Sequence, residues 1–389
     1  MTSAEAQGAW RTMLGIGAAT AAAHIGNNFA TYLIGGLIDR YGFTPVAMGA
    51  WNMAETLSYA CAMFLITPFV SMLNPRRLAI LAGLIVIVAQ ALGALTGSYP
   101  LLLLTRIGTG IGFGLANTAL NLAAAGTRHP ARAISIGITC QTILYAGINL
   151  GLPLVGEAAG VTGMFAALAG LSALLTLGAT LLPSHGGTLS DQPVRLRTGS
   201  HGARVLVAMA LFTFGSLMIW PFMERAAHAI GLSAVEFGRF QSVATLASAF
   251  GNVILAATVG RIRQDIAVGV ALLLCGVACA ALTTVANHAL FATALVAYNV
   301  AWFVSYPLLL GIAYRVSSDG SLAILCSAVW LLMMSLGSLA TGFIAQTLGG
   351  YGAVGPLGLG FCILAALSAA SLARPVAVNP LKAPPSSAG

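Results

Sequence analysis

Charged residues are scarce in this 389-residue chain, where Asp, Glu, Lys and Arg make up 7% of the sequence and hydrophobic residues make up 58%. A water-soluble domain needs a far more polar surface, so this composition excludes an ordinary soluble protein. The few charges fall in short clusters and leave about twelve apolar stretches, each long enough to cross a bilayer as a helix of roughly 20 residues. The sequence therefore predicts an all-α integral membrane protein with twelve transmembrane helices.

The chain also lacks the sequence patterns of intramembrane enzymes and of ATP-driven pumps. It contains no H-E-x-x-H motif, no paired membrane aspartates, no G-x-S-x-G motif with a membrane His and no Walker motif. All six cysteines lie in apolar stretches, and no His or carboxylate lies close to Cys275 and Cys279. We therefore expect neither an enzyme nor a bound metal or cofactor. A channel remains an alternative, although no ring or filter sequence repeats.

The longest polar interruption lies in the middle of the chain and divides six expected helices from six. We expect an N-terminal six-helix bundle over 1–182, a cytoplasmic central loop over 183–203, a C-terminal six-helix bundle over 204–374 and a disordered cytoplasmic tail over 375–389. The expected spans are 10–38, 46–72, 78–96, 101–125, 132–156, 161–182, 204–223, 234–259, 266–285, 289–312, 321–347 and 353–373.

Basic residues are distributed unevenly between the two sides of the predicted membrane. With the N-terminus inside, thirteen lie on the inner side and three on the outer side, which fits the positive-inside rule and predicts cytoplasmic termini in a cell inner membrane. They occur singly or in pairs, so a net charge of +8 does not indicate a nucleic-acid partner. The three outer residues are Arg40, Arg225 and Arg239.

Glu55 is the only acidic residue expected deep in the membrane. It lies nine residues into the second span, which places it about 14 Å deep at 1.5 Å per residue, on a polar helix face. Removing a carboxyl group from water favours its neutral form, so Glu55 is our candidate for a group that binds and releases a proton. A glutamate that fixes helix packing is the structural alternative. The same face carries Trp51, Asn52, Ser58 and Tyr59.

Arg106 and His24 are the other candidates for proton coupling. Arg106 lies about five residues into the fourth span, where it could pair with Glu55, bind an anionic substrate or reach the outer interface. Pairing would favour the charged form of Glu55 and weaken the proton hypothesis. His24 lies near the middle of the first span, where it could relay protons or bond to a neighbouring helix as a neutral ring.

Other polar and aromatic residues of the spans predict a substrate pathway, although aromatic residues at helical spacing also serve packing. His24, Asn27, Asn28, Thr31 and Gly35 share one face of the first span, which we interpret as a cavity lining. Glu224 and Arg225 are expected at the outer membrane interface. The candidate substrate-binding residues are Asn27, Asn28, Thr31, Tyr59, Asn117, Asn121, Gln141, Tyr145, Trp220, Asn299, Trp302 and Tyr306.

The segment Arg106-x-x-x-Gly110-x-x-x-Gly114, within a six-plus-six arrangement of spans, resembles the fourth-helix motif of the major facilitator superfamily. The resemblance covers nearly the whole chain and implies two pseudo-symmetric six-helix bundles whose first, fourth, seventh and tenth helices line a central pathway. It also implies that the arginine is linked to proton movement. Of the family's loop motif after the second span, only Arg76 and Arg77 remain.

Two further segments resemble family motifs in part. Gly147-x-x-x-Gly151-x-Pro153-x-x-Gly156 in the fifth span is similar to the motif of family exporters, with the proline displaced by one residue. Asp39-Arg40-Tyr41-Gly42 is similar to the missing loop motif, but it follows the first span on the outer side, and we interpret it as an ordinary loop.

These observations predict a monomeric secondary active transporter that moves a small organic solute, for example an organic anion, by alternating access. Coupling to protons through Glu55, in symport or antiport, is expected. Its partners would be the substrate, protons and the lipid bilayer. Proton-driven efflux of drugs or amphipathic metabolites is one alternative, and a non-transporting membrane scaffold or receptor is another.

Overall fold

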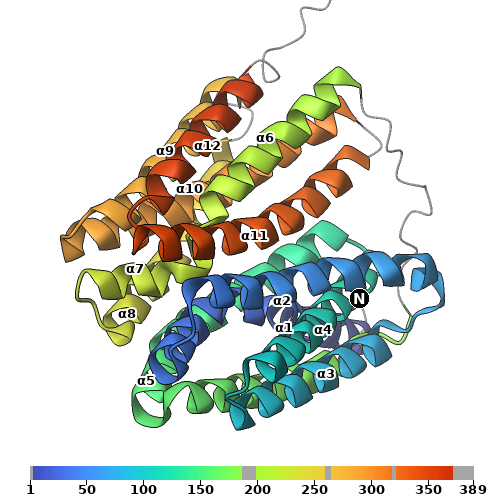
Figure 1. Ribbon diagram of the computed structural model, residues 1–389. Helices are drawn as coiled ribbons and strands as arrows, with labels where there is room; N and C mark the ends of the chain where they lie inside the picture. Colours follow the sequence, from blue (N-terminus) through green and yellow to red (C-terminus); the bar gives the residue numbers. More distant parts are fainter. Residues whose placement is uncertain (1–2, 186–198, 259–263, 318–320, 371–389) are drawn as a thin grey trace, which may run out of the picture.

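The computed structural model describes residues 3–185, 199–258, 264–317 and 321–370 (Figure 1). All regular structure within these residues is helical. The expected disordered tail over 375–389 and most of the expected central loop over 183–203 lie outside them. The order of the helices follows the order of the expected spans.

The first half of the chain forms five α-helices and one short 3-10 helix, which together contain the six expected spans. They are α1 (Ser3–Tyr41), α2 (Pro45–Ile66) with the short 3-10 helix η1 (Thr67–Met72), α3 (Pro75–Leu95), α4 (Tyr99–Ala125) and α5 (Pro130–Ala179). α5 holds both the fifth and the sixth spans and is broken at Gly160, where φ is 64° and ψ is −167°. Because side chains exclude this conformation, glycine permits the sharp change of direction there.

The second half contains the remaining spans. They are α6 (Ser200–Leu217), η2 (Trp220–Phe222) and α7 (Met223–Ala229), then α8 (Ala234–Thr258), α9 (Gln264–Thr284), α10 (His288–Val316), α11 (Ser321–Leu348) and α12 (Val354–Ala370). The seventh span is thus interrupted near Pro221 and continues to Ala229, whereas we expected it to end at 223. Proline removes a backbone donor and prevents a continuous helix at that point.

The helices begin where the sequence supplies caps. Thr44 accepts a hydrogen bond from the Ala47 amide at 3.2 Å, and Asn74 accepts one from the Arg77 amide at 3.1 Å. Each cap is followed by a proline in the first turn. Such caps satisfy amides that have no partner within the helix, and they explain why short polar turns separate long apolar helices.

The helices form two groups, one from each half of the chain (Figure 1). In the first group α1 packs against α5, and α4 packs against α2 and α3. In the second group α12 packs against α6 and α9, and α10 packs against α8 and α9. The groups meet where α2 packs against α11 and where α5 packs against α8. Each helix of the α2–α11 contact supplies a glycine: a Cβ on Gly49 would lie 2.6 Å from the Ser338 carbonyl oxygen, and one on Gly342 would lie 2.5 Å from the Pro45 carbonyl oxygen.

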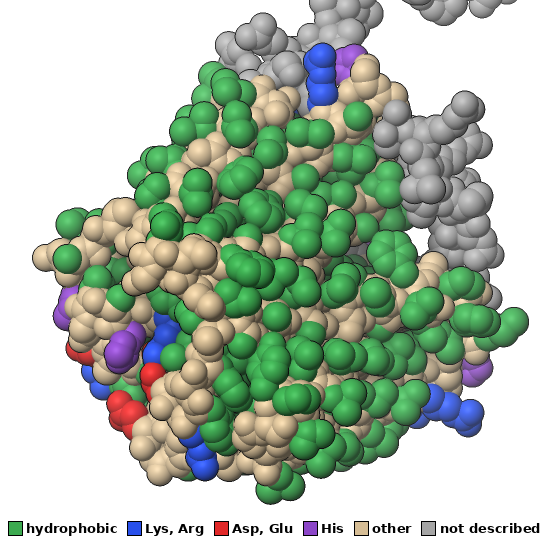
Figure 2. Space-filling model, in the orientation of Figure 1, with side chains coloured by type: hydrophobic (Ala, Val, Ile, Leu, Met, Phe, Trp, Pro, Cys, Tyr) green, Lys and Arg blue, Asp and Glu red, His purple; other side chains and the backbone are tan. Residues whose placement is uncertain are grey.

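Apolar side chains cover the middle of the visible face, and charged side chains gather at its ends (Figure 2). Large apolar residues such as Phe64, Leu65 and Phe250 are more than half exposed. Eight helical stretches of the described chain, α5 among them, are long and apolar enough to cross a bilayer. Exposed apolar surface of this extent requires lipid around it, so the chain is a multi-pass membrane protein.

Candidate functional site

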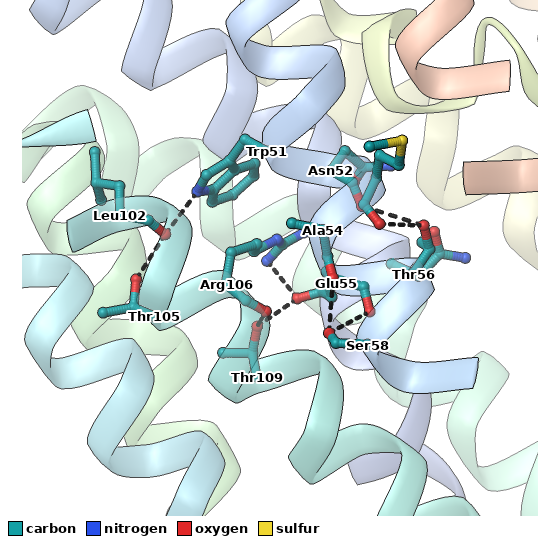
Figure 3. A network of polar contacts seen from close by, with 12 residues as sticks. Trp51, Asn52, Ala54, Glu55, Thr56, Ser58, Leu102, Thr105, Arg106 and Thr109 are labelled. Carbon is teal, nitrogen blue, oxygen red and sulfur yellow. Dashed lines mark hydrogen bonds and ion pairs between the residues drawn. The ribbon is translucent and has the colours of Figure 1, made fainter. Parts of the chain in front are cut away.

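Glu55 and Arg106 form an ion pair between α2 and α4 (Figure 3). Arg106 Nη1 lies 2.7 Å from Glu55 Oε2, and both side chains are 1% exposed. Of the three possibilities for Arg106, the structure shows pairing with Glu55, and the alternative that Arg106 reaches the outer interface is wrong. The arginine is held inside the first group of helices.

The glycines of the fourth-helix motif explain why this pair forms. A Cβ on Gly110 would collide with Ser58 Oγ and with the Glu55 carbonyl oxygen. One on Gly114 would lie 2.6 Å from the Tyr59 carbonyl oxygen. The Arg106-x-x-x-Gly110-x-x-x-Gly114 spacing thus gives α4 a smooth face against α2. This close approach brings a residue at the start of α4 to the carboxylate of α2.

Two neighbours surround the pair. Thr109 Oγ1 donates a hydrogen bond to Glu55 Oε2 at 2.7 Å, and the Arg106 guanidinium lies 3.9 Å from the centre of the Trp51 ring (Figure 3). The Trp51 indole is itself fixed, because its Nε1 donates to the Leu102 carbonyl oxygen at 3.1 Å. The cation–π contact and the hydroxyl compensate part of the cost of burying two charges.

The pair is nevertheless incompletely satisfied. Glu55 Oε1 and Arg106 Nε and Nη2 have no hydrogen-bond partner among the described residues, and Nη1 is close to Oε2 without hydrogen-bond alignment. Both polar atoms of the neighbouring Asn52 amide also lack a partner. Unpaired buried polar groups cost free energy, so this pair is less favourable than a fully hydrogen-bonded one.

His24 lies outside this pair and bonds to a different helix. Its Nδ1 lies 2.9 Å from Gln141 Oε1 and 2.9 Å from the Thr20 carbonyl oxygen. Both partners are acceptors, so Nδ1 carries a proton and donates it. The ring is partly exposed. The structure therefore brings His24 and Gln141 together between α1 and α5.

The outer part of the polar face of α1 contacts the second group of helices. Thr31 Oγ1 accepts a hydrogen bond from the Glu224 amide at 2.9 Å, and Gly35 leaves room for the Glu224 carboxylate. Thr31 is 6% exposed. Our interpretation of the whole face as a cavity lining is thus wrong for Thr31 and Gly35. The reason is that α7 extends the seventh span and covers them.

Glu224 and Arg225 belong to a second charge cluster, which joins the two groups. Arg225 donates to both carboxylate oxygens of Asp39 at 2.6 and 3.0 Å and to those of Glu224 at 2.7 and 3.0 Å. Glu224 is 3% exposed and Arg225 is 9% exposed, so both are buried against other parts of the protein. That they lie near the outer membrane interface stays a prediction. Asp39, which we interpreted as part of an ordinary loop, lies in the last turn of α1.

Trp302 and Tyr306 of α10 lie beside Trp330 of α11, a residue that the sequence analysis did not identify. The rings of Trp302 and Tyr306 stack with centroids 5.5 Å apart and 6° between planes. Trp330 lies 6.4 Å from Trp302 and 5.6 Å from Tyr306. All three are partly exposed. No charge or amide marks Trp330 in the sequence, so only its aromatic character could have signalled it.

Tyr59 lies one helical turn from Glu55 on α2. It is 4% exposed, and its neighbour Ala60 packs with Leu331 and Met334 of α11, beside Trp302 and Trp330. One turn further along α2, Met63 accepts a contact of 3.3 Å from the Asn117 amide and packs near Trp302 and Trp330. The candidate residues around Tyr59 thus come from both groups of helices.

Most of the remaining candidates make hydrogen bonds within the protein, whereas the side-chain oxygen of Asn27 is buried without a partner among the described residues. The Tyr145 hydroxyl donates to the Ala21 carbonyl oxygen at 2.6 Å, and the Trp220 indole donates to the Asn27 carbonyl oxygen at 3.0 Å. Three amides donate to the carbonyl oxygen four residues earlier on their own helix, namely Asn28, Asn121 and Asn299. Among the described residues, no group of three His, Cys, Asp or Glu side chains could hold a metal ion.

The first two glycines of the fifth-helix motif make no close helix contact. A Cβ on Gly147 or on Gly151 would meet nothing within 4 Å, although Pro153 of the same motif is buried against Gly238 of α8. The structure thus shows that the two glycine motifs of the sequence make different contacts. The motif of α4 positions charged residues, whereas the first two glycines of the α5 motif contact nothing.

Two groups of helices joined through α2–α11 and α5–α8 are the fold of the major facilitator superfamily of transporters. Solved structures show the likeness. A variant of the nucleoside transporter NupG matches with a TM-score of 0.75 and 11% identity over 94% of this chain and 100% of its own. A bacterial homolog of the human lysosomal transporter Spinster, inward-facing and unoccupied, has a TM-score of 0.65 and 16% identity over 93% and 92%.

The human organic anion transporter MFSD10 (TETRAN) matches with a TM-score of 0.62 and 17% identity over 94% of this chain and 98% of its own. These neighbours are transporters and not enzymes. No protein-family model and no curated protein sequence matches the chain. At these identities the comparisons define the fold, and the function has to be argued from the site.

Proposed function

We propose that the protein is a monomeric secondary active transporter that moves a small organic solute across a cell inner membrane by alternating access, with both termini in the cytoplasm. The observation that carries the proposal is the buried Glu55–Arg106 pair, which is incompletely hydrogen-bonded and lies one helical turn from Tyr59, where residues of both groups meet. Buried charges of this kind in membrane helices are costly and serve substrate or ion pathways.

The ion pair with Arg106 favours the carboxylate form of Glu55, so we propose that Glu55 takes up a proton only when Arg106 moves to another partner. In this proposal Glu55 is the proton site and Arg106 is its switchable partner. Protonation of Glu55 removes the charge that holds Arg106, and the guanidinium atoms without partners are then available for another anion or for a changed helix contact. Loss of the proton restores the pair. The cycle thus couples one proton to a rearrangement between α2 and α4, and α2 carries the contact to α11. His24, bonded to Gln141, is a proposed relay between α1 and α5.

The contacts between the groups support a state that is closed on the expected outer side. Hydrogen bonds join α2 and α11 at Thr56 and Ser335 (2.7 Å), and α5 and α8 at Asn149 and Thr245 (3.2 Å), near the middle of these helices. Arg225 joins Asp39 at the outer end. We propose that transport opens these outer contacts while the inner ends approach each other.

The residues around Tyr59 suit a small organic solute as the substrate. The neighbours with similar folds include a nucleoside transporter and an organic anion transporter, and either class would suit amide and aromatic residues around Tyr59. Symport and antiport use the same proton site. Efflux of amphipathic compounds gains no structural support, because Gly147 and Gly151 of the exporter-like motif contact nothing.

The experiment that tests this function is proton flux in proteoliposomes under an imposed pH gradient, with organic acids, nucleosides and lipophilic cations added in turn. We expect one class to drive proton flux with the wild-type protein and not with Glu55→Gln. Glu157→Gln is the matched control, because Glu157 is an exposed glutamate of α5. Equal flux with Glu55→Gln and wild type would contradict the assignment of the proton site. Solute movement without proton flux would identify a uniporter.

A further inference from the structure

The aromatic cluster, defined as Trp302, Tyr306 and Trp330, has an unusual hydrogen-bonding state. The indole Nε1 atoms of Trp302 and Trp330 are buried, and neither has a partner among the described residues. A buried donor without an acceptor costs about 1–3 kcal/mol. A cluster built for packing alone would avoid that cost.

Two other tryptophans of the membrane helices, Trp51 and Trp220, both have hydrogen-bond acceptors for their indole groups. The Trp51 indole donates to the Leu102 carbonyl oxygen at 3.1 Å, and the Trp220 indole donates to the Asn27 carbonyl oxygen at 3.0 Å. Buried indoles usually find such partners. The two indoles without partners are neighbours, with ring centroids 6.4 Å apart, so their unused donors belong to one region.

The cluster lies where the two groups of helices meet. Trp302 and Trp330 pack against the contact formed by Ala60 of α2 and Leu331 and Met334 of α11. Ala60 lies five residues after Glu55 on the same helix. The Tyr306 hydroxyl lies 3.3 Å from Ser327 Oγ. A molecule bound at the aromatic cluster would therefore touch the second group while lying next to the proposed proton site of the first.

We propose that the aromatic cluster binds the transported solute and selects a flat aromatic ring that carries hydrogen-bond acceptors. This inference rests on the proposed transport function and names the substrate class of that site. The parallel faces of Trp302 and Tyr306 define a stacking direction that suits a planar ring. The two free indole donors require acceptor atoms, such as a carboxylate or ring nitrogen, and they give no advantage to an ammonium group, which has only donors.

The inference is tested by binding to the purified full-length protein in detergent, without any gradient, by isothermal titration calorimetry. The aromatic probes are benzoate, 2-naphthoate and adenosine. The saturated counterparts are cyclohexanecarboxylate and decahydro-2-naphthoate, and benzyltrimethylammonium is the cationic probe. We expect at least one aromatic probe to bind at least tenfold more tightly than its saturated counterpart and than the cation.

Variants then assign the binding to the cluster. Trp302→Phe and Trp330→Phe keep a ring and delete the donor, so each is expected to weaken binding about fivefold, the loss of one hydrogen bond. Trp302→Leu removes the ring as well and is expected to abolish detectable binding. Trp10→Phe is the matched control, since Trp10 is 64% exposed near the start of α1, and it should bind as wild type does.

The results distinguish this inference from the proposed function. Equal binding of aromatic and saturated probes, tighter binding of the cation, no binding of any aromatic probe, or unchanged binding in both Phe variants would overturn the inference. The proposed transport function would remain valid if another solute class still drove proton flux. Selective aromatic binding that depends on Trp302 and Trp330, together with absent flux, would instead keep the binding site and reject transport.

Discussion

Two charge clusters among the described residues each pair an arginine with carboxylate groups, but they join different parts of the molecule. Glu55 and Arg106 pair between α2 and α4, both within the first group of helices. Arg225 binds Glu224 beside it and Asp39, which lies 186 residues away in the other group. One cluster is therefore internal to a group, and the other connects the two groups.

This difference determines how each cluster can take part in alternating access. When two groups of helices move as rigid bodies, a contact within one group is carried along unchanged, and a contact between groups is broken. The Glu55–Arg106 pair can respond only to a change of charge, such as protonation or an incoming anion. The Arg225–Asp39 contact responds to the motion itself. We therefore propose that the first cluster acts in coupling and the second in closure.

Breaking the internal pair is expected to have the largest effect on stability. Arg106→Met leaves the Glu55 carboxylate buried and unpaired, and we expect it to lower the free energy of unfolding by about 3–5 kcal/mol. The Glu55→Gln, Arg106→Met double variant removes both charges and should recover much of that loss. Unfolding of the purified proteins in detergent measures these values. Additive losses in the double variant would show that the two side chains do not interact.

Opening the outer contact is expected to change the population of states. Arg225→Gln removes the bonds to Asp39, and we expect the outer-open state to become about tenfold more populated, which corresponds to about 1.4 kcal/mol. Spin labels at Arg40→Cys and Arg239→Cys, two exposed positions on α1 and α8, report the outer separation. The exposed Cys61 and Cys140 are first replaced by Ser.

Two variants act as controls for this measurement. Asp39→Asn keeps the shape of the side chain and removes its charge, so it should shift the distances in the same direction by a smaller factor. Glu157→Gln should leave the outer distance unchanged, because it removes the charge of an exposed side chain of α5. An unchanged distance distribution in Arg225→Gln would contradict the assignment of Arg225 to the closure of the outer side.

The position of the Glu55–Arg106 pair depends on how closely α2 and α4 approach each other. The glycines of α4 and α5 allow this dependence to be tested, because Gly110 lies at a close helix contact and Gly147 does not. Gly110→Ala places a methyl group against Ser58 and the Glu55 backbone and is expected to cost about 1–3 kcal/mol of stability. Gly147→Ala meets nothing and should be neutral or slightly stabilising, since alanine favours the helix. Thermal unfolding in detergent compares the two. Equal effects would mean that α2 and α4 do not need the glycine at position 110.

The sequence predicted the parts of this molecule that depend on local composition. Apolar length located the spans, and the arginine–glycine spacing identified the helix face that carries Arg106. It left open whether Glu55 and Arg106 meet, because their contact depends on how closely two helices approach. The structure provides that approach at Gly110 and Gly114.

Contacts between segments far apart in the sequence could not be predicted from the sequence. Asp39 and Arg225 each look like ordinary charges at a helix end, and only the arrangement of α1 beside α7 makes them partners. Glu224 was assigned to the interface because the apolar stretch ends before it, whereas the chain continues as α7 and buries it. Trp330 carries no pattern of its own, and its significance comes from Trp302 and Tyr306 on another helix.

Substitution of Glu236 is expected to have the smallest effect on the outer distance. It tests whether the contact between Arg225 and Asp39, or only the total charge of that end, closes the outer side. Glu236 lies at the same outer end as Glu224, but it is exposed and bonds to Ser233 of its own group, where its Oε2 accepts from the amide and the hydroxyl at 2.9 Å each. Glu236→Gln weakens only this helix cap, so we expect slightly lower thermal stability and an unchanged outer distance. If it opened the outer side as much as Arg225→Gln does, closure would depend on the total charge of that end. The contact between Arg225 and Asp39 would then lose its special role.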